Sequence, residues 1–278
     1  MVQRALPVRE PRLGRPRGAV GQAPHAVVLV LPGGGTVGGG RRGSVLAAAS
    51  AVPLARRLGN ATSRDDPLVA HIVRYRSRGW AGSAVDPAQD AEWAVEEVVR
   101  RYGDVPVCLV GADVGGRAAL RAAGHPAVVS VVALGPCLEE ADARPDGAGG
   151  AETGQTGQTG QTGEAGEQGD GGDTVRRLRG RHVLLVHGTA DTTTDPELSY
   201  RFAERAKKVN AQVCRFEVHT DGHGLRGYAF EVACLTRDFV LGTLCARDFS
   251  RPLADAFAAP PPLGLRMPLA SGFGRNLP

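Results

Sequence analysis

Apolar residues gather in short runs along most of the chain, and amphipathic stretches separate these runs. Five of the runs are almost continuous: 25–32, 70–80, 105–111, 128–135 and 181–188. Runs of this length predict parallel strands that are covered on both faces. A sixth segment, 211–219, alternates apolar residues with Arg215, Glu217 and His219, which predicts a half-exposed strand near a sheet edge.

Helices are predicted in the gaps between these strands. One begins with Asp86 as its N-cap and Pro87 in its first turn, and another repeats the pattern with Asp195 and Pro196. The last helix has apolar residues at spacings of four, three and four: Tyr228, Val232, Leu235 and Phe239. Alternating strands and helices predict an α/β fold with a mostly parallel sheet, helices on both faces and reactive loops at the carboxyl ends of the strands.

Three segments have compositions that are poorly suited to a core. Residues 1–24 are rich in Arg, Pro and Gly, residues 139–174 are acidic and contain a Thr-Gly-Gln repeat, and residues 249–278 are rich in Pro. Each is predicted to be disordered. The folded domain is therefore expected to cover 25–248, interrupted by the insert at 139–174.

The net charge of +4 changes this picture little. Residues 1–24 hold five arginines and one glutamate, which account for the whole excess. A solvated tail explains this charge better than a nucleic-acid site does. The five cysteines form no Cys-x-x-Cys pair, and no apolar run is long enough to span a bilayer, so a cytoplasmic protein without a membrane segment is expected. The oligomeric state leaves no trace in the sequence.

The segment LVGADVGGRAAL, residues 109–120, has the pattern of a nucleophile elbow. An apolar strand enters a tight turn between Gly111 and Gly115 and leaves it in an alanine-rich helix. Asp113 occupies the central position, where serine is usual. A carboxylate at a helix N-terminus is also stabilised without any catalytic role, so the pattern leaves both interpretations open.

Further candidate residues follow other predicted strands. Asp191 lies in HGTAD, His223 lies in DGHG, and Gly33 to Gly35 follow the first strand. Together with Asp113 they supply a nucleophile, an orienting acid, a proton-transferring histidine and backbone donors for an oxyanion. Asp191 could instead be a turn residue, and His223 a surface histidine.

The order of nucleophile, acid and histidine resembles that of α/β-hydrolases. The resemblance covers about Ala26 to Leu244 apart from the acidic insert. It implies that Asp191 orients His223, that His223 is the catalytic base, and that a small-molecule substrate is hydrolysed without metal or cofactor. It also places Gly34, Gly35 and Val114 in the oxyanion hole.

An aspartate at the elbow resembles haloalkane dehalogenases and epoxide hydrolases, in which the carboxylate attacks carbon and histidine-activated water releases the ester. Those proteins carry tryptophan after the nucleophile, where this chain has Val114, and a helical cap in the place of 139–174. The resemblance thus implies either a hydrolase of small ester-like or alkyl electrophiles, or a catalytically silent relative that binds a small molecule or a protein. A second carboxylate beside His223 is expected to raise the pKa of this histidine above 6.5.

Three other interpretations receive less support from the sequence. GGGTVG at 33–38 matches a dinucleotide-binding pattern, but the candidate arginines Arg74 and Arg76 lie about forty residues downstream rather than twenty. HTDGH at 219–223 offers too few ligands for a tetrahedral metal site. The remaining possibility is a serine nucleophile other than residue 113, but Ser44, Ser50 and Ser130 all lie away from the elbow in the sequence.

Overall fold

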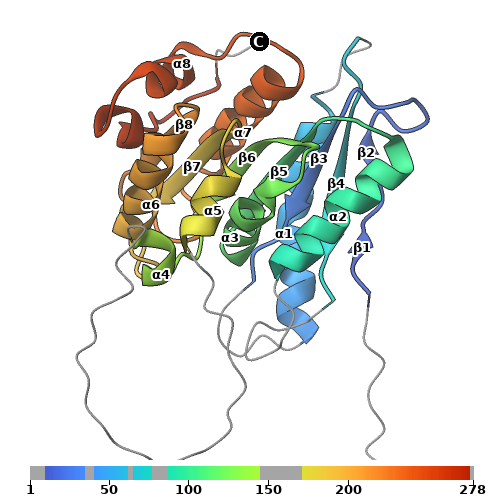
Figure 1. Ribbon diagram of the computed structural model, residues 1–278, viewed down its shortest axis with the longest axis horizontal. Helices are drawn as coiled ribbons and strands as arrows, with labels where there is room; N and C mark the ends of the chain where they lie inside the picture. The colour runs from blue at the N-terminus through green and yellow to red at the C-terminus, as the bar shows by residue number, and fades with distance from the viewer. Residues whose placement is uncertain (1–9, 35–40, 62–64, 77–86, 145–170, 276–278) are drawn as a thin grey trace, which may run out of the picture.

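The computed structural model describes residues 10–34, 41–61, 65–76, 87–144 and 171–275. Its centre is a twisted sheet in the order β1-β4-β3-β5-β6-β7-β8-β9, with β2 also paired to β4 (Figure 1). The pairs between β3, β4, β5, β6, β7, β8 and β9 are parallel, and β1 and β2 run antiparallel to β4. The strands are β1 (Arg12–Leu13), β2 (Arg17–Gly18), β3 (Ala26–Leu31), β4 (Leu68–Arg74), β5 (Val107–Ala112), β6 (Val128–Leu134), β7 (His182–Gly188), β8 (Val213–Val218) and β9 (Met267–Pro268).

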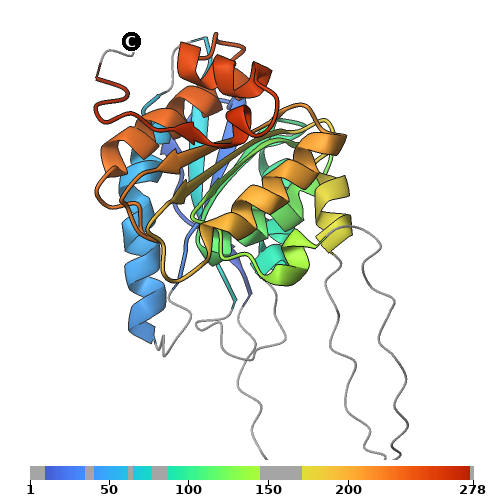
Figure 2. The ribbon, with the colours of Figure 1, turned by 90° about the vertical axis from the view of Figure 1, so that its left-hand side faces the viewer.

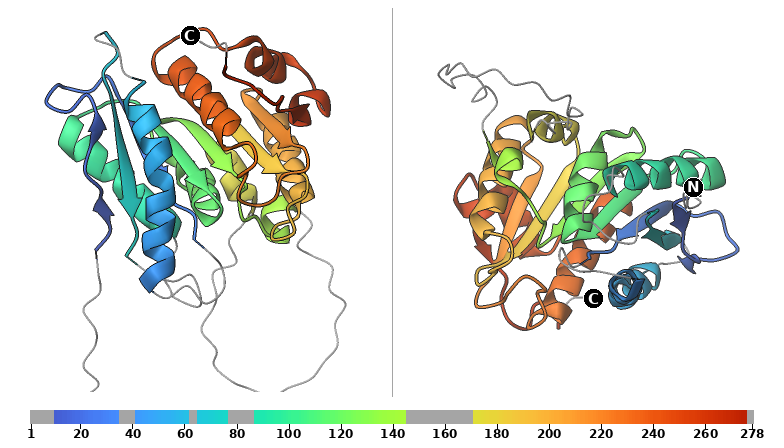
Figure 3. Two further views of the ribbon diagram at one scale, coloured as in Figure 1. Left: turned by 180° about the vertical axis from the view of Figure 1, so that it is seen from behind. Right: turned by 90° about the horizontal axis from the view of Figure 1, so that it is seen from below.

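Helices cover both faces of the sheet, as the alternating pattern predicts (Figures 1 and 3). One face packs against α2 (Pro87–Tyr102), α3 (Val114–Arg121), α5 (Gly171–Arg177) and α6 (Pro196–Val209). The other packs against α1 (Arg41–Gly59), α7 (Ala229–Leu244) and α8 (Arg251–Ala258). The short elements are the helix α4 (Glu140–Ala143) and the 3-10 turns η1 (Ala122–Gly124) and η2 (Leu263–Leu265).

Each inner strand contributes to both cores. In β3, Val27 and Leu29 belong to one buried cluster, whereas Val28 and Val30 belong to the other. Successive side chains point to opposite faces of a strand, so an apolar residue is needed at every position. This explains the continuous apolar runs. Figure 2 shows the two helical layers on either side of the sheet.

The strand order reverses at β3, which lies between β4 and β5. The chain leaves β3 toward β4 on one side and returns to β5 on the other. Loops that follow β3 and β5 therefore separate at the carboxyl edge of the sheet, where doubly wound folds bind their ligands. Gly34 and Asp113 lie in these two loops.

One of the two predicted helix starts lies among the described residues, and the structure confirms it. The Asp195 side chain accepts a hydrogen bond from the Glu197 N–H at 2.9 Å, with Pro196 at the start of α6. Asp86 lies outside the described residues, although α2 begins at Pro87. None of the described helices is long and apolar enough to cross a bilayer.

The C-terminal segment is folded, so the prediction of a disordered tail over 249–278 is wrong for its described residues. Leu253 and Leu265 are fully buried, and Leu269 is nearly so. Prolines in this segment mark boundaries, since Pro252 lies in the first turn of α8 and Pro260 follows its end. A high proline content here reflects short elements rather than an absence of structure.

β8 also differs from the prediction, because all its residues are buried. The Arg215 guanidinium donates to the Glu217 carboxylate at 2.8 Å and to the Leu265 carbonyl at 2.9 Å, so these polar positions face the C-terminal segment and not solvent. Burial of a charged side chain is tolerated when it is paired and hydrogen-bonded in this way.

The described residues of the other two segments, 1–24 and 139–174, also include ordered elements. β1 and β2, within 1–24, pair with β4, and Gly18 (φ 107°) lies where a Cβ would overlap the Leu68 carbonyl. Within 139–174, α4 and α5 flank the undescribed part 145–170, and Val175 directly after the segment is buried. Composition averaged over a long window misses such short ordered ends.

Candidate active site

Asp113 lies at a sharp turn between β5 and α3. Its backbone has φ 52° and ψ −123°, a conformation that non-glycine residues rarely adopt and that costs about 1–3 kcal/mol. A Cβ at Gly111 would overlap the Gly115 carbonyl, and one at Gly115 would overlap the Leu31 carbonyl. The two glycines therefore let the turn close. The strand–turn–helix context that defines a nucleophile elbow is present.

Three predicted side chains meet at the carboxyl edge of the sheet. His223 Nε2 lies 3.2 Å from Asp113 Oδ1, and His223 Nδ1 lies 2.7 Å from Asp191 Oδ2. Asp191 comes from the loop after β7 and its side chain is fully buried, whereas the His223 side chain is 23% exposed. The imidazole thus bridges two carboxylates from separate loops.

The second oxygen of Asp113 contacts the loop after β3. Gly34 N–H donates to Asp113 Oδ2 at 3.1 Å. Val114 is the first residue of α3, directly after the turn, and Gly35 lies outside the described residues. The resemblance implies that the Gly34 N–H stabilises an oxyanion. In this structure the same N–H donates to the Asp113 carboxylate.

The pKa of His223 is raised to about 9. The contact with Asp113 is the largest cause, burial opposes it, and Asp191 adds to it. At neutral pH the imidazole is therefore protonated and donates from both nitrogens. This agrees with the argument that a second carboxylate beside His223 favours the imidazolium form.

Comparisons with known proteins give similarity in structure alone. No protein-family model and no curated protein matches this chain. A thermophilic esterase of Thermogutta terrifontis, solved with propionate bound, is 17% identical with a TM-score of 0.56 and aligns over 84% of this chain and 94% of its own. A monoacylglycerol lipase of Paleococcus ferrophilus is 17% identical with a TM-score of 0.55, over 84% and 99% of the two chains.

A third similar structure is Est1E of Butyrivibrio proteoclasticus, at 15% identity and a TM-score of 0.54, over 85% of this chain and 93% of that one. These matches agree with the mostly parallel sheet and its helical layers. The chain has the α/β-hydrolase fold. At such low identity the likeness extends to the fold and not to the reaction.

Within this α/β-hydrolase fold, the His223 ion pairs should make stability depend on pH. The pKa of His223 is about 9 in the folded chain and about 6.5 when unfolded. This stabilisation is therefore complete below pH 6.5 and is lost as the pH rises through 9. Relative to His223→Gln, we expect the wild-type free energy of unfolding to fall by about 3 kcal/mol between pH 6 and 9.5. Urea unfolding at both pH values measures this, and equal losses in the two proteins would contradict the assignment.

Sequence reasoning missed three buried polar residues behind Asp191. His187 Nε2 lies 3.0 Å from Asp191 Oδ2, and Ser199 and Arg215 continue the contacts away from the site. The available sign was a histidine at the end of the apolar strand at 181–188, in a position where only apolar or small residues would be expected. Its partners come from α6 and β8, and no local pattern connects them.

The structure gives no added support to a dinucleotide site or to a serine nucleophile other than residue 113. Arg76 is paired with Asp90, at 2.5 Å between Nε and Oδ1, rather than left available for a nucleotide phosphate. The Ser130 hydroxyl is buried in β6 and accepts a hydrogen bond from Thr243 at 3.0 Å. Ser50 lies on α1, away from the elbow, and the side chain of Ser44 is not among those described.

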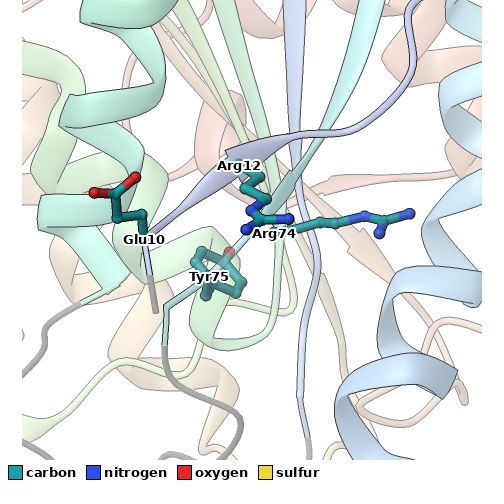
Figure 4. A pocket seen from close by; sticks show the side chains of 4 residues that line it. All are labelled: Glu10, Arg12, Arg74 and Tyr75. Atoms are coloured by element: carbon teal, nitrogen blue, oxygen red, sulfur yellow. The ribbon is translucent and has the colours of Figure 1, made fainter. Parts of the chain in front are cut away.

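A hollow of about 300 Å³ lies at the carboxyl end of β4 (Figure 4). Glu10, Arg12, Arg74 and Tyr75 line it, and the Arg74 side chain extends away from Glu10 and Tyr75. The Tyr75 hydroxyl donates to the Pro32 carbonyl at 3.1 Å, just before Gly33 and Gly34. None of the candidate catalytic side chains lines this hollow.

Proposed function

We propose that the protein is a hydrolase that opens small alkyl electrophiles, such as epoxides or haloalkanes, through an ester on Asp113. The observation that carries this proposal is that the two carboxylate oxygens of Asp113 have different partners. Oδ2 accepts the Gly34 N–H, while Oδ1 lies 3.2 Å from Nε2 of the protonated His223. One oxygen is thus held by a backbone donor where the ester carbonyl would need it, and the other, the proposed nucleophile, is paired with the histidine that would serve the second step.

In the first step, Asp113 Oδ1 attacks a saturated carbon and the leaving group departs with the bonding electrons. An aspartate carboxylate needs no base for this step, in contrast to a serine hydroxyl. The ester that forms is uncharged. The largest cause of the raised His223 pKa is then gone, so the imidazolium can release its Nε2 proton to the leaving group or to water.

In the second step, neutral His223 accepts a proton from water as the water oxygen attacks Asp113 Cγ. Negative charge develops on Oδ2, where the Gly34 N–H is already in place. When the intermediate collapses, the alkoxide takes the proton from His223 and leaves as an alcohol. The remaining carboxyl proton passes to His223, which restores both the carboxylate and the imidazolium. The net reaction is hydrolysis: an epoxide gains water to form a diol, and a haloalkane exchanges its halide for a hydroxyl group. A high resting pKa of His223 is thus compatible with its later role as a base.

A direct test traps the ester. His223→Gln keeps Asp113 anionic but removes the base of the second step, so incubation with an epoxide or a haloalkane should add the mass of the alkyl group to the whole chain. Intact-mass spectrometry and peptide mapping should place the adduct on Asp113, with stoichiometry approaching one. The double variant Asp113→Asn/His223→Gln serves as the control and should gain no mass.

The burial of Oδ1 favours a second candidate function. This atom has no exposed surface and lies against His223, as in a structural ion pair. Such a pair suits a relative that binds a small molecule or a protein without turning it over. Absence of both adduct and turnover over a panel of epoxides, haloalkanes and activated esters would support this alternative and contradict the first.

A further inference from the structure

A second histidine lies against the acid of the site. His187 is fully buried near the end of β7, and its Nε2 lies 3.0 Å from Asp191 Oδ2, the same oxygen that His223 Nδ1 contacts at 2.7 Å. We propose that His187 is a positioning residue, whose Nε2–H fixes Asp191 Oδ2 in line with His223. This inference rests on the proposed function, although its test below does not require turnover.

The hydrogen bonds of Asp191 decide which ring nitrogen of His187 carries hydrogen. Asp191 Oδ1 accepts the N–H groups of Thr193 and Thr194, at 2.8 and 3.1 Å. These donors and His223 lower the pKa of Asp191 against the effect of burial, so the carboxylate is ionised and only accepts. His187 must therefore donate from Nε2.

A buried chain of contacts fixes this tautomer. His187 Nδ1 lies 2.9 Å from Ser199 Oγ, and the same oxygen receives Arg215 Nε–H at 3.0 Å. Ser199 Oγ also lies 2.8 Å from the Pro196 carbonyl oxygen. This oxygen accepts another hydrogen bond, at 3.1 Å, from Arg215 Nη2. The single Ser199 hydrogen can thus be given to Nδ1 without leaving Pro196 unpaired.

The charges around His187 keep it neutral. Burial is the largest cause that lowers its pKa, Arg215 and protonated His223 act in the same direction, and Asp191 opposes them. Asp191 Oδ2 consequently lies between one charged and one neutral imidazole. The His187 donor takes up part of the negative charge of Oδ2 and so weakens the stabilisation of the His223 imidazolium by Asp191, which makes it easier for the Nε2 proton to leave before the second step.

The chain offers a conservative variant and a matched control. Glutamine places an N–H near the position of a histidine Nε2, so His187→Gln retains the donor, whereas His187→Leu removes it. His71 is also fully buried with two hydrogen bonds, to the Gly14 carbonyl at 2.8 Å and the Tyr102 hydroxyl at 2.7 Å. It lies on β4, so His71→Leu matches the loss of packing without touching Asp191.

The experiment is an NMR titration of the His223 ring in the full-length protein. We expect the His223 midpoint to move upward in His187→Leu and to stay at the wild-type value in His187→Gln and His71→Leu. An unchanged midpoint in His187→Leu, or an equal shift in His71→Leu, would overturn the proposal. If the wild type turns over a substrate, His187→Leu should also lower kcat by roughly tenfold or more, with KM little changed.

A milder variant keeps the test decisive if His187→Leu does not fold. Ser199→Ala leaves His187 in place but removes the partner of Nδ1. We expect the nitrogen chemical shifts of His187 to show a larger share of the Nδ1–H tautomer, together with an upward shift of the His223 midpoint. Retention of the wild-type tautomer in Ser199→Ala would contradict the assigned chain of contacts. Failure of the proposed function would instead appear as absent turnover with these shifts intact.

Discussion

Asp113→Asn is expected to lower the hydrolysis of an epoxide or a haloalkane by at least about a thousandfold. The amide has nearly the same shape as the carboxylate and can still accept the Gly34 N–H, but it is a far weaker nucleophile. Steady-state kinetics of the two proteins measure the loss. The same substitution removes the largest cause of the raised His223 pKa, so an NMR titration should show the midpoint falling.

Asp113→Ser is the informative partner of this variant. With a hydroxyl at the elbow, His223 loses a carboxylate neighbour and becomes neutral near pH 7, and an ordinary Ser-His-Asp arrangement results. New activity on activated esters would show that the machinery around residue 113 is intact. Wild-type rates in Asp113→Asn would contradict the proposed nucleophile.

Removal of residues 251–278 is expected to prevent folding of the rest of the chain. The deletion removes Leu253, Leu265 and Leu269 and exposes the apolar surface that they cover. It also removes the Leu265 carbonyl, which accepts a hydrogen bond from the buried Arg215 guanidinium. Each buried leucine contributes about 1.5–3 kcal/mol, so the loss is comparable with the whole stability of a domain. Circular dichroism and urea unfolding of the truncated chain measure the effect.

Two leucines of η2 provide a matched control for this prediction. Leu265 is fully buried, whereas Leu263 is 67% exposed only two residues away. Leu265→Ala should cost about 2–5 kcal/mol and Leu263→Ala less than about 0.5 kcal/mol. A truncated chain that unfolds cooperatively at the wild-type urea concentration would show that the segment is dispensable.

The sequence predicts the parts of the fold that depend on local pattern. The run at 25–32 predicts β3 because each face of the strand meets a helical layer, and Asp195 with Pro196 predicts the start of α6. The elbow is equally local, since Gly111 and Gly115 lie two residues on either side of Asp113. Such features need no knowledge of distant residues.

Features that depend on distant partners were not predicted. Arg215 and Glu217 have the spacing of solvent-facing residues, but their burial depends on Leu265, fifty residues later. The proposed role of Asp191 is predicted from its order in the chain, whereas its contact with His187 depends on a network that reaches α6 and β8. A charged residue and its buried partner are separated in sequence, so a linear pattern cannot show that they meet.

The bridging position of His223 also sets the local charge that an incoming molecule meets. Two carboxylates and one imidazolium carry a net charge of −1, in a chain whose formal charge is +4 when every histidine is counted as neutral. Within a few ångströms this local charge outweighs the distant positive residues, because the interaction falls with distance and solvent screens it. In its resting state the site thus discriminates by charge: neutral electrophiles approach without penalty, and carboxylate-bearing ones are repelled.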